Sequence, residues 1–189
     1  MADLPRILAF SGSIRKASVN TQLLHVAAAA VQRAGGQSTV LSLQDYPLPL
    51  FNGDLENESG MPDPAKALVE ALVAHDGLLI ACPEYNSMVT PLLKNTIDWC
   101  SRADDNPFEG KVVAVVSASP GAFGGVRSLT AVRQMMTHLG AWVVPVACSV
   151  AQADKAFDPQ GQLINPRTQK TVDRVALALI DLCRKLKGQ

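Results

Sequence analysis

The polar residues at positions 12–21 have the types and spacing needed to bind a phosphate group. They precede a predicted helix, whose first N–H groups and positive dipole end favour an anion. An arginine adds a forked, permanently charged donor for phosphate oxygens. A plainer interpretation is that a serine or asparagine here only caps the helix, but capping leaves the density of serines and the arginine unexplained. The groups offered are the hydroxyls of Ser11, Ser13, Ser18 and Thr21, the Asn20 amide and the Arg15 guanidinium.

A second polar segment, residues 83–86, directly follows an apolar run and suits a flat ring. Pro83 stiffens the chain as it leaves the strand and has no N–H of its own. The backbone N–H groups that follow it could donate to ring heteroatoms, and Tyr85 offers a flat edge. From the residues alone, Glu84 could instead be a general base, and Asn86 could do no more than satisfy the turn.

A third segment, residues 117–125, combines serine hydroxyls with three glycines. Glycine lets the backbone approach a ligand closely and adopt positive φ. The same composition also suits a flexible connector. What favours a site is that all three segments follow predicted strands of one sheet.

The elements that position these segments alternate along the chain between short apolar runs and longer helical patterns. Strands that are apolar on both faces and separated by helices predict a parallel sheet covered on both sides. The expected strands are 6–10, 38–43, 77–82, 111–117 and 141–146. The expected helices are 20–34, 65–74, 90–101, 126–139 and 168–187, and the stretches 44–64 and 151–167 look irregular.

This pattern predicts an α/β fold in a single domain spanning residues 1–189: a doubly wound, flavodoxin-like sandwich with a five-stranded parallel sheet. The expected strand order is 2-1-3-4-5. In such sheets, ligands bind outside the carboxyl ends of the strands, near the point where the strand order reverses. The three polar segments follow the three central strands, so we expect them to meet at that edge.

Composition narrows the classes of partner. The formal net charge is zero and no run of Lys or Arg occurs, which gives no electrostatic reason to expect nucleic acid or an anionic membrane. No apolar run approaches the roughly 18–20 residues needed to cross a bilayer. The four cysteines are scattered without CxxC spacing and the N-terminus lacks a signal-peptide pattern, so we expect a cytoplasmic protein with buried thiols.

Several common kinds of site are disfavoured by missing motifs. Neither GxGxxG nor GxxxxGK[ST] is present, which argues against an ordinary dinucleotide site or P-loop. No GxSxG elbow places a nucleophilic serine. The histidines and acids lack metal-ligand spacing, so no metal site is predicted.

Taken together, the motifs resemble those of the NAD(P)H-dependent FMN reductase family, which includes bacterial chromate and quinone reductases. The segments that carry the resemblance are 12–21, 83–86, 93–99 and 117–121. The resemblance implies that FMN phosphate is held by Ser13, Arg15, Ser18, Asn20 and Thr21. It implies contacts to the isoalloxazine ring from Pro83, Glu84, Tyr85 and Asn86, with Ser117, Ser119 and Gly121 on the other side.

The resemblance also implies the activity. Hydride passes from NADPH or NADH to bound FMN, and a quinone or similar small acceptor then takes two electrons in a ping-pong scheme. No side chain is assigned as catalytic, because the flavin carries the redox chemistry. Family members are typically homodimers or homotetramers. Two alternatives stay open: a flavodoxin-type electron carrier, although such carriers are usually strongly acidic, and a flavin-binding sensor without turnover.

Overall fold

Six strands form one parallel sheet in the computed structural model, which describes residues 4–188. The order is β2-β1-β3-β6-β7, and β8 also pairs with β6. The two central strands, β3 and β6, are buried along their whole length, as expected for strands covered on both faces. The strands are β1 (Arg6–Ser11), β2 (Gln37–Leu41), β3 (Gly77–Ala81), β6 (Val112–Ala118), β7 (Trp142–Val143) and β8 (Cys148–Val150).

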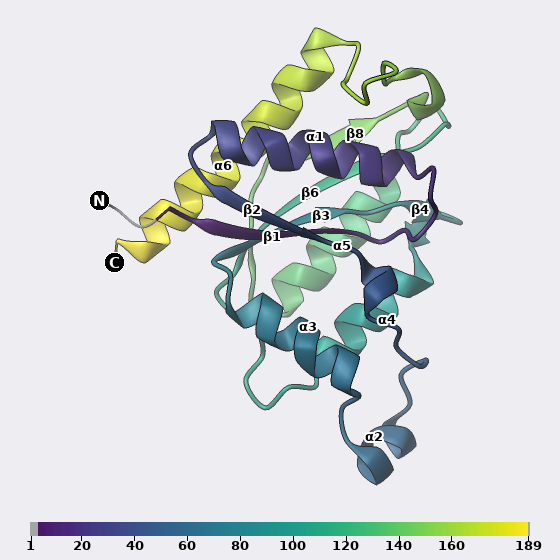
Figure 1. Ribbon diagram of the computed structural model, residues 1–189, viewed down its shortest axis with the longest axis vertical. Coiled ribbons are helices and arrows are strands. Elements are labelled where there is room, and N and C mark those ends of the chain that lie inside the picture. The colour runs from purple at the N-terminus through teal and green to yellow at the C-terminus, as the bar shows by residue number, and fades with distance from the viewer. Residues whose placement is uncertain (1–3, 189) are drawn as a thin grey trace.

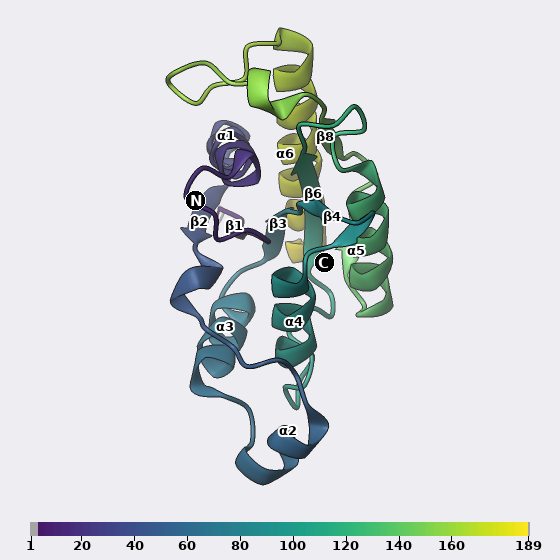
Figure 2. The same cartoon turned by 90° about the vertical axis from the view of Figure 1, so that its right-hand side faces the viewer.

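Helices cover both faces of this sheet and enclose two separate cores (Figures 1 and 2). One face carries α1 (Val19–Arg33) and α6 (Pro166–Lys187), which pack on alternate strand residues such as Ile7 and Ala9. The other face carries α3 (Asp63–Val73), α4 (Pro91–Cys100) and α5 (Val126–His138), which pack on the strand residues between them. The doubly wound α/β sandwich predicted from the sequence is therefore the observed fold.

The predicted count of five strands is wrong, because the expected strand 141–146 is interrupted. The chain forms β7, leaves the ladder, and returns as β8, and both pieces pair with β6. Pro145 lies between them. Proline has no N–H to donate to a ladder, which accounts for the break. The last position of the predicted order is therefore shared by two short strands.

The segment expected to be irregular at 44–64 contains a short helix, α2 (Gly53–Ser59), capped by the Asn52 side chain. A 3-10 turn, η1 (Leu43–Asp45), precedes it, and a second, η2 (Ala153–Lys155), lies in the other irregular segment. The helix α2 projects beyond α3 and α4 (Figures 1 and 2). The chain that leads into α2 is held by Asn95 of α4. The Asn95 Oδ1 accepts the Phe51 N–H at 2.8 Å, and its Nδ2 donates to the Pro49 carbonyl at 2.9 Å.

A small hairpin, which the sequence analysis treated as a simple turn, follows β3. Its strands are β4 (Glu84–Tyr85) and β5 (Met88–Val89), which pair antiparallel. The two loop residues, Asn86 and Ser87, both have positive φ, at 50° and 68°. That conformation matches the right-handed twist of a tight hairpin. The hairpin turns the polar segment 83–86 away from the main sheet.

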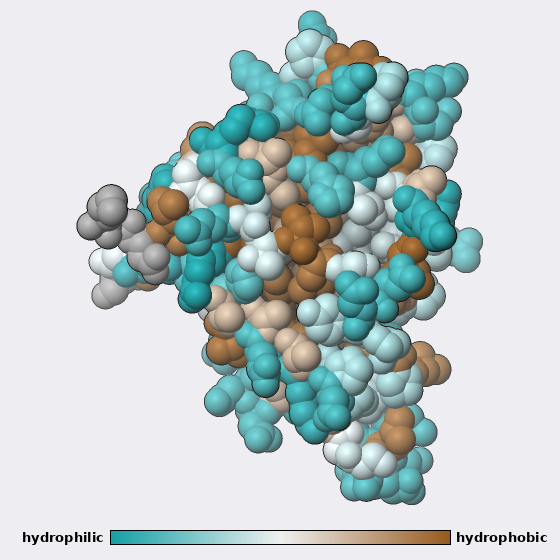
Figure 3. Space-filling view, in the orientation of Figure 1, coloured by the Kyte–Doolittle hydropathy of each residue, from teal (hydrophilic) through white to brown (hydrophobic). Residues whose placement is uncertain are grey.

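Among residues 4–188, no helix is both long enough and apolar enough to span a bilayer. On the side that shows α1 and β2, apolar groups form small separate patches among hydrophilic ones (Figure 3).

Candidate functional site

The first two polar segments meet at the carboxyl edge of the sheet through bonds around Gly12. Its N–H donates to the Ala81 carbonyl at 2.9 Å. Its own carbonyl accepts the Thr90 hydroxyl at 2.7 Å. A Cβ at Gly12 would lie 2.9 Å from Thr90 Oγ1 and 3.0 Å from Leu93 Cβ, so a side chain would force α4 away. Glycine is therefore needed here for close packing, which brings the two turns together.

The first turn presents unpaired donors at the start of α1. The Ser18 hydroxyl caps the helix by accepting the Thr21 N–H at 3.3 Å, and the Ser13 hydroxyl accepts the Arg15 N–H at the same distance. Neither the exposed Arg15 guanidinium nor the N–H groups of Val19 and Asn20 have a partner among residues 4–188. Charged and neutral donors at a helix start form an anion site.

Asn20 uses its side chain to join α1 to the end of β6. Its Nδ2 donates to the Ala118 carbonyl at 2.8 Å, and its Oδ1 accepts the Ala118 N–H at 3.0 Å. The asparagine is buried, and the two residues are 98 positions apart. The observed role of this amide is therefore to hold the first and third segments together.

Glu84 fixes the second segment to α5. Its Oε2 accepts the N–H groups of Arg127 at 2.9 Å and Ser128 at 3.3 Å, and its Oε1 lies 3.3 Å from Arg127 Nε. The residue before α5 is Gly125, which has no side chain to cap the helix. Glu84 supplies that cap from the hairpin, so its carboxylate is committed to the start of α5.

The other residues of the second segment frame an opening. Pro83 is buried, and Tyr85 keeps 48% of its surface exposed. Asn86 lies at the tip of the hairpin, where it is exposed.

The third segment is closed by its own hydrogen bonds. The buried Ser117 hydroxyl donates to the Gly124 carbonyl at 2.5 Å. The Ser119 hydroxyl accepts the Gly121 N–H at 3.2 Å. Gly125 has a φ of 85°, and a Cβ there would approach Ser117 Oγ to 2.9 Å. The serines and glycines of this segment therefore shape the loop, and only part of it faces the opening.

The three segments enclose a cleft of about 140 Å³. Eight of the twelve predicted site residues line it: Ser13, Arg15, Ser18, Asn20, Pro83, Glu84, Tyr85 and Ser119. The other four, which do not, are Thr21, Asn86, Ser117 and Gly121. The lining also includes Val19, Ala118 and Pro120, which the sequence analysis did not single out. Their apolar side chains carry no chemical signal, and only the folded geometry places them there.

The comparison with known proteins decides the family. A family model described as NADPH-dependent FMN reductase matches residues 5–155. The chain belongs to this family. It is 35% identical over 192 residues to an NAD(P)H-dependent FMN reductase of Pseudomonas aeruginosa, with 100% of both chains covered. It is 33% identical over 189 residues to an NADPH:quinone oxidoreductase of Arabidopsis thaliana, covering 98% of this chain and 95% of that protein.

Solved structures give the same result. FerB, described as a flavoenzyme NAD(P)H:(acceptor) oxidoreductase from Paracoccus denitrificans, superposes with a TM-score of 0.81 at 25% identity. The match covers 96% of this chain and 98% of that one. The family, the enzyme class and the FMN cofactor predicted from the motifs are confirmed by these comparisons.

The residues present fit FMN. The unpaired Arg15 guanidinium and the free N–H groups at the start of α1 suit its phosphate. Pro83, Glu84 and Tyr85 of the second segment border the same cleft. Pockets that enclose a ligand typically measure about 300–1,000 Å³. The cleft, at about 140 Å³, is smaller than this range.

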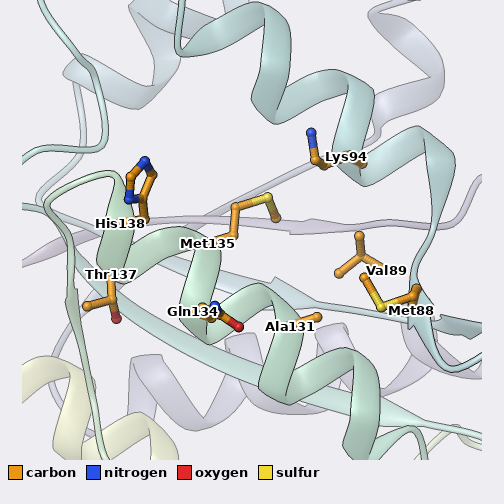
Figure 4. Close-up of a pocket in the computed structure, with 8 residues that line it drawn as sticks. All are labelled: Met88, Val89, Lys94, Ala131, Gln134, Met135, Thr137 and His138. Carbon is orange, nitrogen blue, oxygen red and sulfur yellow. The ribbon is translucent and has the colours of Figure 1, made fainter.

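A larger cavity of about 660 Å³ lies beyond the hairpin, between α4 and α5 (Figure 4). Met88 and Val89 of β5 border it on one side, and Ala131 and Met135 of α5 border it on another (Figure 4). Lys94 also lines it, and this lysine is paired with Asp98, one helical turn along α4. None of the twelve predicted site residues lines this cavity.

The four cysteines are free and buried. Cys82 lies between the end of β3 and Pro83. Burial raises the pKa of its thiol to about 11. A thiol with so high a pKa is a poor nucleophile near neutral pH, since the thiolate is the reactive form. Cys82 therefore serves the packing beneath the cleft.

Proposed function

We propose that the chain oxidises NADPH or NADH and reduces a quinone or similar small acceptor, in two separate half-reactions of a ping-pong scheme. The observation that carries the proposal is the meeting of three sequence segments at one open cleft, in a chain of the FMN reductase family. Relatives named NADPH:quinone oxidoreductase and quinone reductase support the acceptor class. FMN, when bound, supplies the two-electron redox chemistry that couples the two half-reactions.

The first turn is proposed to hold the phosphate of the cofactor. Arg15 supplies a charged fork, and the N–H groups of Val19 and Asn20 supply neutral donors. Ser13 and Ser18 line the cleft together with Arg15, Val19 and Asn20. Asn20 and Thr21 contribute through the helix start rather than by their side chains, because the Asn20 amide is bonded to Ala118.

The hairpin is proposed to contact the ring with Pro83, Tyr85 and its backbone. The one carboxylate among the cleft-lining residues, that of Glu84, is bonded to the start of α5. It is therefore assigned to positioning and not to proton transfer. With that carboxylate committed, the protein's part is binding and orientation, in keeping with a reaction whose chemistry resides in the cofactor.

We further propose that the enzyme works in the cytoplasm as a homodimer or homotetramer. The four unpaired cysteines suit a reducing compartment. The oligomeric state is inferred from the family resemblance, and light scattering of the purified protein tests it directly. A monomer at micromolar concentration would contradict it.

Steady-state kinetics test the proposed scheme. Initial rates are measured with NADPH and with NADH at several fixed concentrations of benzoquinone. Two separate half-reactions predict parallel lines in the double-reciprocal plot, because the first product leaves before the acceptor binds. Intersecting lines would contradict the ping-pong scheme, and the absence of quinone-dependent oxidation of either donor would contradict the function.

A further inference from the structure

Arg127 lies beside the hairpin, where its side chain contacts Glu84 of the cleft lining and has no role assigned so far. It is the second residue of α5, and its guanidinium reaches back to the hairpin. There its Nη1 donates to the Ser87 hydroxyl at 2.7 Å, and its Nε lies 3.3 Å from Glu84 Oε1. The guanidinium carbon also lies 5.1 Å from the centre of the Phe123 ring. Contacts from three directions hold this side chain in one orientation.

The orientation leaves part of the guanidinium free. An arginine has five N–H donors in a rigid fork. Two of them are accounted for by Ser87 and Glu84, and the others have no partner among residues 4–188. The side chain is 49% exposed. A pre-oriented fork with open donors suits bidentate binding of phosphate oxygens, since little conformational freedom is left to lose.

The charges around the hairpin favour an anion at Arg127. Glu84 is the carboxylate that faces the guanidinium, and its negative charge is shared with two N–H groups at the positive end of α5. The next cation beyond the hairpin, Lys94, is neutralised by Asp98. Arg15 belongs to the proposed phosphate site of the cofactor. Arg15 therefore lines the cleft itself, and Arg127 lies beside the hairpin, paired with Glu84 through one nitrogen and with other donors open.

We propose that Arg127 binds the diphosphate of the nicotinamide dinucleotide that donates hydride. The inference rests on the proposed function, because the nicotinamide must lie over a ring held at the hairpin. The diphosphate is the anionic group that NADH and NADPH share, and it is nearer to the nicotinamide than the 2′-phosphate of NADPH is. The quinone acceptor carries no phosphate, so Arg127 serves one half-reaction and not the other.

The test separates the two half-reactions in the FMN-loaded enzyme. Anaerobic stopped-flow measurements give the dissociation constants of NADPH and NADH during flavin reduction. Enzyme reduced with dithionite then gives the rate of oxidation by benzoquinone. In the Arg127→Ala variant, we expect both donor constants to rise about 10- to 100-fold, as for a lost charged hydrogen bond. The quinone rate and the FMN dissociation constant should stay within about twofold, and Arg127→Lys should recover part of the donor binding.

Matched variants separate binding from structure. Arg174→Ala removes the same charge from an exposed position on α6 and should leave the donor constants as in the wild type. Ser87→Ala removes the hydroxyl that accepts from Arg127 Nη1 but keeps the guanidinium. A purely structural role for the contact predicts that Ser87→Ala and Arg127→Ala weaken the binding of NADPH and NADH alike, whereas the proposal predicts a much smaller effect for Ser87→Ala.

The outcomes are distinct. The proposal would be overturned if the dissociation constants of NADPH and NADH stayed within twofold of the wild-type values in Arg127→Ala. It would also be overturned if FMN binding or the rate of oxidation by benzoquinone fell as much as NADPH and NADH binding did. If Arg127→Ala weakened the binding of NADPH but not of NADH, Arg127 would contact the 2′-phosphate, and the diphosphate assignment would be overturned. If neither donor reduces the wild-type flavin, the proposed function fails. Titration of NADP⁺ into the oxidised enzyme, followed by the flavin spectrum, still tests Arg127 in that case.

Discussion

Replacing Asn20 by alanine should lower the free energy of unfolding by several kcal/mol, because the side chain bonds two buried backbone groups. The substitution removes two hydrogen bonds and leaves the buried N–H and carbonyl of Ala118 without partners. Each buried backbone group left unpaired costs about 1–3 kcal/mol. The expected loss is therefore about 2–6 kcal/mol of unfolding free energy. For a chain of this size, a loss of about 4 kcal/mol lowers the melting temperature by roughly 8–16 °C.

Asn95 provides a matched control. Its amide makes the same two kinds of bond, to Phe51 N–H and the Pro49 carbonyl, at a more exposed position. Water can replace the lost partner there, so Asn95→Ala should cost about 0.5–1.5 kcal/mol for each bond. Of the two residues, Asn20 alone joins the first segment (12–21), the proposed phosphate site, to β6. Only its replacement should therefore also weaken FMN binding.

Urea unfolding of both variants, with and without FMN, measures these differences. We expect a larger loss of stability for Asn20→Ala than for Asn95→Ala, and reduced stabilisation by FMN for Asn20→Ala alone. If Asn20→Ala lost less than about 1 kcal/mol, or less than Asn95→Ala, the proposed clamp between α1 and β6 would be refuted.

Three further predictions follow from individual groups. Arg15→Ala should weaken FMN by about 1.5–3 kcal/mol and leave riboflavin unchanged; equal weakening of both in a fluorescence titration would remove Arg15 from the phosphate site. The Ser11 hydroxyl is buried without a partner among residues 4–188, so Ser11→Ala should raise unfolding free energy or leave it unchanged, and a loss above about 1 kcal/mol in urea would contradict this. Burial raises the pKa of Cys82 and Cys148 to about 11 and of Cys100 and Cys183 to about 12. Because a raised pKa lowers the thiolate fraction, native thiols should react slowly with a disulfide reagent near pH 8 and faster as pH rises; a rapidly reacting native thiol would contradict the burial.

The buried elements of the fold were predictable because their residues have an unambiguous pattern. The strands β3 and β6 are continuous apolar runs, and they form within one or two residues of the expected bounds. The hairpin was missed for a physical reason. Its two loop residues, Asn86 and Ser87, both adopt positive φ without a glycine, whereas the usual hairpin signal is Asn-Gly or Asp-Gly.

The site was predictable as a set of turns but not as a set of contacts. Composition and strand order indicated that three segments meet, and eight of twelve residues line the cleft. The sequence could not show which polar atoms face a ligand and which bond the backbone. Asn20 bonds a residue 98 positions away, and Glu84 bonds one 43 positions away. No local pattern encodes such pairings, and both residues were expected to contact FMN because the family resemblance implied it.

The absorption spectrum of the protein, loaded with FMN and desalted, shows whether the cleft binds flavin and whether NADPH or NADH reduces it. We expect that flavin stays bound, that its visible absorbance falls rapidly when NADPH or NADH is added without oxygen, and that benzoquinone restores it. A chain that retains flavin but is reduced by neither donor would contradict the proposed function. A chain that retains no flavin would contradict the cleft formed by the three turns as its binding site.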